Sequence, residues 1–113
     1  MSLGDICLAN FPFGAGGGIK LRPVLLLTGL VGTVPEVLVA YISSVQPPAL
    51  LPSDVLLDPS ASEHRSTNLK SISVLRLHKL ATVHQRSVVR HIGQVSPVTA
   101  AAIAAKLRIL LSL

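Results

Sequence analysis

Residues 36–44 (EVLVAYISS) decide the fold, because this apolar, β-branched run predicts a buried strand. Pro35 precedes the run and residues 46–48 (QPP) follow it, so a strand-terminating residue lies close to each end. Alternation along a strand places Tyr41 and Ser43 on the same face. We therefore expect a central strand that ends in a hydroxyl group, which is either a functional group or only the polar fringe of the core.

Shorter segments on both sides of this run also have strand character. Towards the N-terminus, residues 5–9 alternate weakly, and residues 23–27 (PVLLL) fit a strand that is buried on both faces. Between them, residues 10–20 (NFPFGAGGGIK) predict a loop, because glycine-rich segments hold regular structure at a high entropic cost. Towards the C-terminus, the pattern predicts strands at residues 54–57, 71–77 and 91–95, a polar loop at 59–68 and an ambiguous, partly helical stretch at 85–90.

The C-terminal segment predicts one α-helix. Ser96 is a favourable N-cap and Pro97 a favourable first helical residue. Lys106 and Arg108 lie towards the end of the helix, where its dipole favours cations. Apolar residues follow at helical spacing, namely Val98, Ile103, Leu107, Leu110 and Leu111. Several short strands and one terminal helix predict a mainly β, α+β fold: a small, strongly bent antiparallel sheet or barrel with the helix packed against it.

Composition narrows the classes of function. The 113 residues suit one domain, residues 1–113, with an aliphatic core, since only three residues are aromatic. The net charge of +5 favours an anionic partner such as nucleic acid, an acidic protein or a membrane surface, although it also serves plain solubility. The single cysteine, Cys7, excludes an internal disulfide and fits a buried structural thiol. With no signal-peptide pattern and no membrane-spanning apolar run, we expect a cytoplasmic protein without a membrane partner.

Common catalytic and nucleotide-binding motifs are missing. Gly18 is followed by Ile19 and Lys20 instead of the lysine and hydroxyl residue of a phosphate-binding P-loop, and Ile19 also breaks a dinucleotide fingerprint. The four histidines have no metal-ligand spacing, so we expect no metal site. No GxSxG motif occurs, which removes hydrolase triads of that type. The glycine loop is either a mobile hairpin or a lid that orders over a ligand.

Three places remain as candidates for chemistry. Arg22 precedes Pro23, which favours an extended backbone, and its guanidinium is a permanently charged fork suited to phosphate. Ser43 ends the central strand, and strand alternation places Arg76 and His78 on one face. Each of these residues has an equally simple alternative as a solvated residue at a strand end or edge.

Taken together, the segments resemble the MazF/PemK (Kid) toxins of bacterial toxin–antitoxin pairs. The resemblance follows nearly the whole chain in order: residues 4–6 (GDI), 10–13 (NFPF), 20–23 (KLRP), 40–43 (AYIS), 73–77 (SVLRL), 81–82 (AT), 92–93 (IG) and the helix beginning at Ser96-Pro97.

The resemblance implies an SH3-like barrel of the CcdB/PemK type with a C-terminal helix, acting as a homodimer. It also implies a toxin that cleaves single-stranded RNA without a metal or other cofactor, which inhibits translation and growth. In the MazF branch the chemistry uses the arginine of the Arg-Pro pair and a threonine, here Arg22 and Ser43. In the Kid branch it uses an Arg-x-Asp, which is Arg76-Leu77-His78 here, so histidine replaces the acid and offers a base near neutral pH.

Phe13, Lys20 and Lys79 are the expected RNA-binding residues. An acidic antitoxin is the expected protein partner, and DNA is expected to interact only indirectly, through an antitoxin complex. Two alternatives remain. One is a gyrase poison resembling CcdB, although the last helix ends RILLSL without an aromatic residue. The other is a non-catalytic nucleic-acid or protein-interaction module of the same fold.

Overall fold

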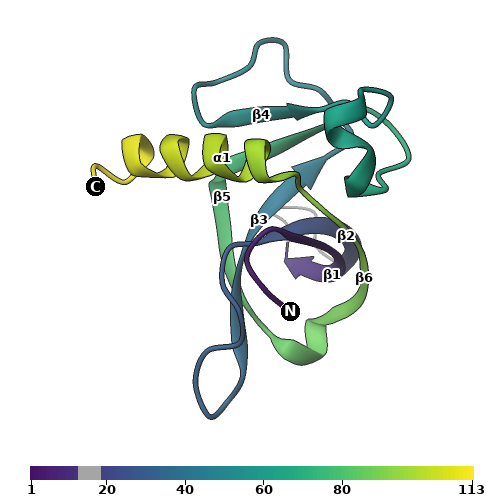
Figure 1. Ribbon diagram of the computed structural model, residues 1–113. Helices are drawn as coiled ribbons and strands as arrows, with labels where there is room; N and C mark the ends of the chain where they lie inside the picture. The colour runs from purple at the N-terminus through teal and green to yellow at the C-terminus, as the bar shows by residue number, and fades with distance from the viewer. Residues whose placement is uncertain (13–18) are drawn as a thin grey trace.

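The computed structural model describes residues 1–12 and 19–113. In these residues six strands form one antiparallel sheet, in the order β4-β5-β3-β2-β1-β6, and a single α-helix follows (Figure 1). The predicted α+β class, with an antiparallel sheet and a C-terminal helix, is confirmed. The elements are β1 (Asp5–Pro12), β2 (Ile19–Leu26), β3 (Glu36–Ser43), β4 (Asp54–Leu57), the 3₁₀ helix η1 (Ser62–Thr67), β5 (Ser73–His84), the 3₁₀ helix η2 (Gln85–Ser87), β6 (Val88–Gln94) and α1 (Pro97–Leu110).

Strands β1 and β2 are longer than the sequence predicts. They pair with each other as far as Pro12 with Ile19, so both ends of the predicted loop at residues 10–20 belong to the sheet. Backbone pairing stabilises these ends although their composition is typical of a loop. Phe13, one of the expected RNA-binding residues, lies outside the described residues.

Strand β5 is also longer than predicted, and its pairing with β3 changes register. Residues 80–84 pair with residues 36–40, whereas residues 74–76 pair with residues 41–43, which leaves residues 77–79 as an irregular insertion. Three is an odd number, so the insertion reverses the alternation of side chains along β5. Leu75 and Leu77 accordingly belong to one buried cluster, and the partly buried Ala81 and the buried Val83 to the other.

The two clusters form the core. One includes Ile6, Leu25 and Ile42 and is covered by α1 through Ile103, while the other includes Val24 and Val39. Cys7 lies in the second cluster, where burial, with a further contribution from the charge of Asp5, raises the pKa of its thiol and suits the predicted structural role. Strand pairing and this two-sided packing together account for the aliphatic composition.

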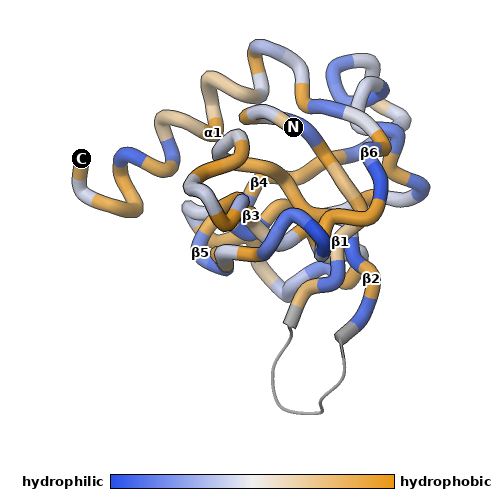
Figure 2. The backbone as a smooth tube through the Cα atoms, turned by 90° about the horizontal axis from the view of Figure 1, so that it is seen from below, coloured by the Kyte–Doolittle hydropathy of each residue, from blue (hydrophilic) through white to orange (hydrophobic). Residues whose placement is uncertain are grey.

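Helix α1 begins as predicted. The Ser96 hydroxyl accepts a hydrogen bond from the Thr99 amide at 3.2 Å, and Pro97 is the first helical residue. The C-terminal half of α1 extends past the sheet and ends in apolar residues (Figure 2). Ile109 is 77% exposed and Leu113 beyond it 86% exposed. Within the described residues no helix is long and apolar enough to cross a membrane.

Helix η1 lies where a polar loop was predicted at residues 59–68, so that prediction is wrong in part. It packs against β6 at Gly93, where an added Cβ atom would overlap the Thr67 carbonyl oxygen. Two side chains fix the contact: Ser66 donates to the Gln94 carbonyl at 2.8 Å, and Asn68 to the Ile92 carbonyl at 2.7 Å. This long-range contact is what orders a segment whose own sequence is polar.

Candidate nucleic-acid interface

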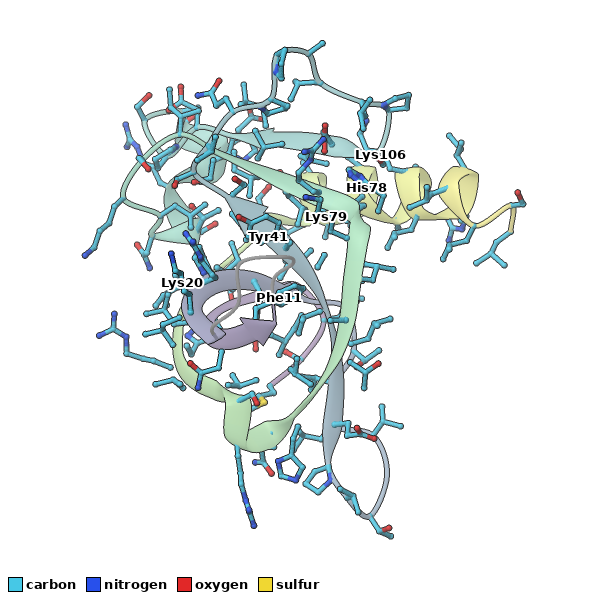
Figure 3. All side chains as sticks on the ribbon, turned by 180° about the vertical axis from the view of Figure 1, so that it is seen from behind. Phe11, Lys20, Tyr41, His78, Lys79 and Lys106 are labelled. Carbon is cyan, nitrogen blue, oxygen red and sulfur yellow. The ribbon has the colours of Figure 1, made fainter. Side chains whose placement is uncertain are left out.

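Two of the three aromatic residues meet on one side of the sheet. The rings of Phe11 on β1 and Tyr41 on β3 stack with their centroids 5.9 Å apart and their planes at 26°. The ammonium group of Lys79 lies 5.6 Å from the centre of the Tyr41 ring, and Lys20 pairs directly with Phe11 (Figure 3). The expected RNA-binding residues Lys20 and Lys79 therefore border an aromatic pair. Strand alternation predicted that Tyr41 and Ser43 share a face, but the stacking of Phe11 on Tyr41 has no local signal in the sequence because it depends on the order of the strands.

Arg22 lies on β2 at the end of its pairing with β3. The paired residues of these strands run from Leu26 opposite Val39 to Val24 opposite Tyr41. The same register, continued by two residues, would bring Arg22 opposite Ser43, but the pairing of the two strands ends before these residues. Arg22 is half-buried, so the rotational freedom of its side chain is restricted before any ligand binds.

Ser43 is buried, and its hydroxyl group is engaged locally. It donates to the Val45 carbonyl at 3.0 Å and accepts from the Val45 amide at 3.1 Å. These bonds shape the turn after β3. A phosphate oxygen could accept from this hydroxyl only in place of the Val45 carbonyl.

A cavity of about 240 Å³ lies beside Arg22, and we call it the cationic cavity. Its charged lining comes from three elements of the chain: Arg22 of β2, Lys70 from the segment after η1, and Arg90 of β6. The remaining lining includes apolar walls and a few short polar side chains, with Leu8, Ile42, Ile92, Ser44 and Asn68 among them. Sequence reasoning missed Lys70 and Arg90, since nothing in their spacing links them to Arg22.

Arg76 is held by an acidic partner. Its Nε and Nη2 atoms donate to the two carboxylate oxygens of Asp54 at 2.9 and 3.2 Å, and the Asp54 side chain is fully buried. Burial alone would raise the pKa of Asp54. The hydrogen bonds from Arg76 and from the Leu51 amide, together with the charges of Arg76 and His78, outweigh it and lower the pKa. The pair joins β4 to β5 and offsets much of the charge that Arg76 could offer to a phosphate.

His78 lies within the β5 insertion, two residues beyond Arg76, and has a different neighbour. Its Nδ1 atom is 2.8 Å from the Ser53 hydroxyl. It lines a second, larger cavity of about 500 Å³ beside α1, together with Lys106, Ile109 and Leu110. Among the described residues, Arg22 and His78 line different cavities, so the structure does not gather the four predicted catalytic residues around one.

The larger cavity has mostly apolar walls, whereas the smaller one has three cations, so the smaller is the better site for an anionic ligand. In residues 1–12 and 19–113, no three histidine, cysteine, aspartate or glutamate side chains are grouped so that they could hold a metal ion. The side-chain groups available for binding or catalysis in this region are therefore guanidinium and ammonium groups, hydroxyls, one imidazole and two stacked rings.

Comparison with known proteins identifies the family. Residues 2–111 match the PemK-like, MazF-like toxins of type II toxin–antitoxin systems. The chain belongs to this family. No curated protein matches the sequence.

Solved structures of the family have the same fold. The Mycobacterium tuberculosis toxin MazF-mt6 is 24% identical with a TM-score of 0.74, over 96% of this chain and 97% of that one. MazF from Deinococcus radiodurans is 18% identical with a TM-score of 0.71, over 100% and 97% of the two chains. An endoribonuclease from a mycobacterial species, in complex with its cognate antitoxin, is 18% identical with a TM-score of 0.68, over 100% and 96%. The family resemblance predicted from the segments is thus confirmed.

Proposed function

We propose that this family member is a sequence-selective endoribonuclease that cleaves single-stranded RNA in the cytoplasm and thereby inhibits translation and growth. The observation that carries the proposal is the position of Arg22, half-buried at the end of the β2–β3 pairing, in the lining of a cavity with two further cations. Structurally similar proteins described as endoribonucleases support the same activity. The half-buried Tyr41 ring, packed on the buried Phe11, and the nearby cations together suit unpaired nucleotides, which expose both a ring face and a phosphate.

The proposed reaction uses the nucleophile that RNA itself carries. The 2′-hydroxyl attacks the adjacent phosphorus, the bond to the 5′-oxygen breaks, and a 2′,3′-cyclic phosphate and a 5′-hydroxyl end result. Arg22 neutralises the equatorial oxygens of the transition state and assists the leaving oxygen. The Ser43 hydroxyl turns from the Val45 carbonyl to a phosphate oxygen.

Arg76 and His78 have lesser roles in this proposal. Arg76 pairs with Tyr41 across the strands, and the part of its positive charge that Asp54 does not offset attracts the RNA phosphates. His78 is the remaining candidate for the general base, and its Nδ1 contact with Ser53 leaves Nε2 for the proton. Because His78 lines a different cavity from Arg22, an RNA strand that contacts both residues would have to extend from the cationic cavity towards α1.

We also propose that the protein acts as a homodimer and that an acidic antitoxin segment binds to the basic surface around the cationic cavity. A mycobacterial endoribonuclease complexed with its cognate antitoxin and a MazE–MazF complex from Deinococcus radiodurans support such a partner. A flexible acidic segment would order on binding, as coupled folding and binding allows.

Cleavage of a long RNA in the presence of EDTA tests the proposed activity. We expect discrete cuts with 5′-hydroxyl ends, and Arg22→Ala should slow them by about 10²–10³-fold, since a donor aimed at the developing charge is lost. Arg22→Lys keeps the charge but loses the planar fork, so it should recover only part of the rate.

Arg86→Ala is the matched control, because Arg86 is an exposed arginine on η2 that does not line the cationic cavity. A folded Arg22→Ala protein that cleaves as fast as this control would show that Arg22 is not catalytic. RNA binding without any cleavage by the unmodified protein would instead support the non-catalytic module.

A further inference from the structure

The cationic cavity has an unusual charge balance. Arg22, Lys70 and Arg90 line it, and no aspartate or glutamate is among its described lining residues. Lys70 and Arg90 are exposed, and neither forms an ion pair with any residue in the described ranges. Like charges that converge without a carboxylate repel one another, and a bound anion would relieve this repulsion.

The size and the apolar walls of the cavity suit a single ring. Leu8, Ile42 and Ile92 supply apolar surface, and the volume of about 240 Å³ lies below the range typical of sites for drug-sized ligands. Asn68 adds a fixed polar group. Its amide nitrogen is held by the Ile92 carbonyl at 2.7 Å, and no described residue donates to its side-chain oxygen.

We propose that the cationic cavity is a subsite for one nucleotide next to the scissile phosphate. Lys70 and Arg90 bind the phosphate of that nucleotide, the apolar walls receive its base, and the Asn68 side-chain oxygen accepts a hydrogen bond from an N–H group on the base edge. The inference rests on the proposed RNA cleavage, because Arg22 borders both the subsite and the proposed reaction centre. It adds Lys70, Arg90 and Asn68 to the residues that select the substrate.

The test is binding of a 2′-fluoro RNA, which keeps the phosphates and bases but lacks the attacking hydroxyl. Fluorescence anisotropy over a range of salt concentrations gives both the Kd and its salt dependence. We expect Lys70→Gln and Arg90→Gln each to raise the Kd about tenfold, as the loss of one charge-assisted hydrogen bond does. Each variant should also reduce the slope of log K against log salt by about 0.7, the value for one phosphate contact on a single strand.

Arg108→Gln is the matched control, because it removes the same charge from an exposed residue of α1 that does not line the cavity. If all three variants weaken RNA binding equally, the effect is that of overall charge and the subsite is wrong. If Lys70→Gln and Arg90→Gln weaken only the binding of an acidic peptide, the cavity serves a protein partner and the proposal is also wrong.

Base recognition is tested with a series of 2′-fluoro RNAs in which one abasic nucleotide is moved along the strand. We expect one position where loss of the base weakens binding to the unmodified protein, and a smaller loss at that position in Asn68→Gly. Glycine retains the positive φ of 54° at this residue, so the backbone is not strained. If no abasic position weakens binding, the cavity does not receive a base.

These measurements separate the subsite from the proposed activity. RNA that binds through Lys70 and Arg90 but is never cleaved in its natural form would leave the subsite in place and remove the nuclease. If the unmodified protein cleaves RNA but Lys70→Gln and Arg90→Gln bind RNA as tightly as the control does, the nuclease activity stands and the subsite is wrong.

Discussion

At the scale of single residues, Arg22 and Arg76 differ in what surrounds them. Both are arginines on strands near Tyr41, and both were predicted to act on phosphate. The guanidinium of Arg76 is bound by a buried carboxylate, whereas Arg22 borders a cavity with two further cations. Sequence patterns identified both residues but could not rank them, since Asp54 is far from Arg76 along the chain.

The Asp54–Arg76 pair gives a prediction for stability. Asp54→Ala should lower the free energy of unfolding by about 3 kcal/mol, because it leaves a partly buried arginine without its partner. Denaturant unfolding measures this loss, and Glu63→Ala, which removes a carboxylate with 62% exposure, should change little.

The pH dependence of that loss has a definite sign. The folded pKa of Asp54 lies below its ordinary value of 3.8, so the pair contributes fully above pH 3.8 and its contribution disappears as the pH falls through the folded pKa. The difference between the unmodified protein and Asp54→Ala should therefore shrink below about pH 4. A difference that stays constant down to acid unfolding would assign the effect to packing.

At the scale of elements, local pattern predicted some segments well. Residues 54–57 and the capped helix were predicted correctly, and β3 ends one residue before its predicted end. These segments carry their own signals, namely apolar runs with terminators and a capping residue. The full lengths of β1, β2 and β5 and the formation of η1 depend on pairing partners distant in sequence, which no local pattern contains.

The contact of η1 with β6 gives the prediction at this scale. Gly93→Ala should destabilise the fold by about 1–3 kcal/mol, because its Cβ atom would overlap backbone atoms of Ser66 and Thr67 that have little room to move. Gly29→Ala is a suitable control, since its nearest described neighbour would be 3.4 Å away. Thermal unfolding that shifts equally in both variants would contradict the importance of this contact.

At the scale of the whole molecule, the candidate site depends on the order of the strands. Residues 22, 70 and 90 are widely separated in sequence and meet because β1 lies between β2 and β6. The net charge of +5 predicted an anionic partner but not where it binds. Residue patterns and the family resemblance together predicted Arg22 and Ser43, while the aromatic pair and the cationic cavity required the three-dimensional structure.

The apolar end of α1 gives the prediction at this scale. Ile109 is 77% exposed, and Leu51 and Leu110 line the larger cavity with it. Exposed apolar side chains grouped in this way are typical of a protein–protein interface. We expect a homodimer in sedimentation experiments and a monomer for Ile109→Asp. Val98→Asp, at an equally exposed apolar residue in the first turn of α1, should remain a dimer. A chain that sediments as a monomer at all concentrations would refute the homodimer.

The three-residue insertion in β5 also constrains how this chain could change in length. Deleting one residue among 77–79 would leave an insertion of two residues, which no longer reverses the alternation of side chains. Every side chain on one half of the strand would then turn to the opposite face. Deleting two would shorten the insertion and leave each half facing as it does now. Insertions and deletions that the fold tolerates at this point should therefore add or remove an even number of residues. Alignments of distant relatives should show length differences of two residues here and not of one.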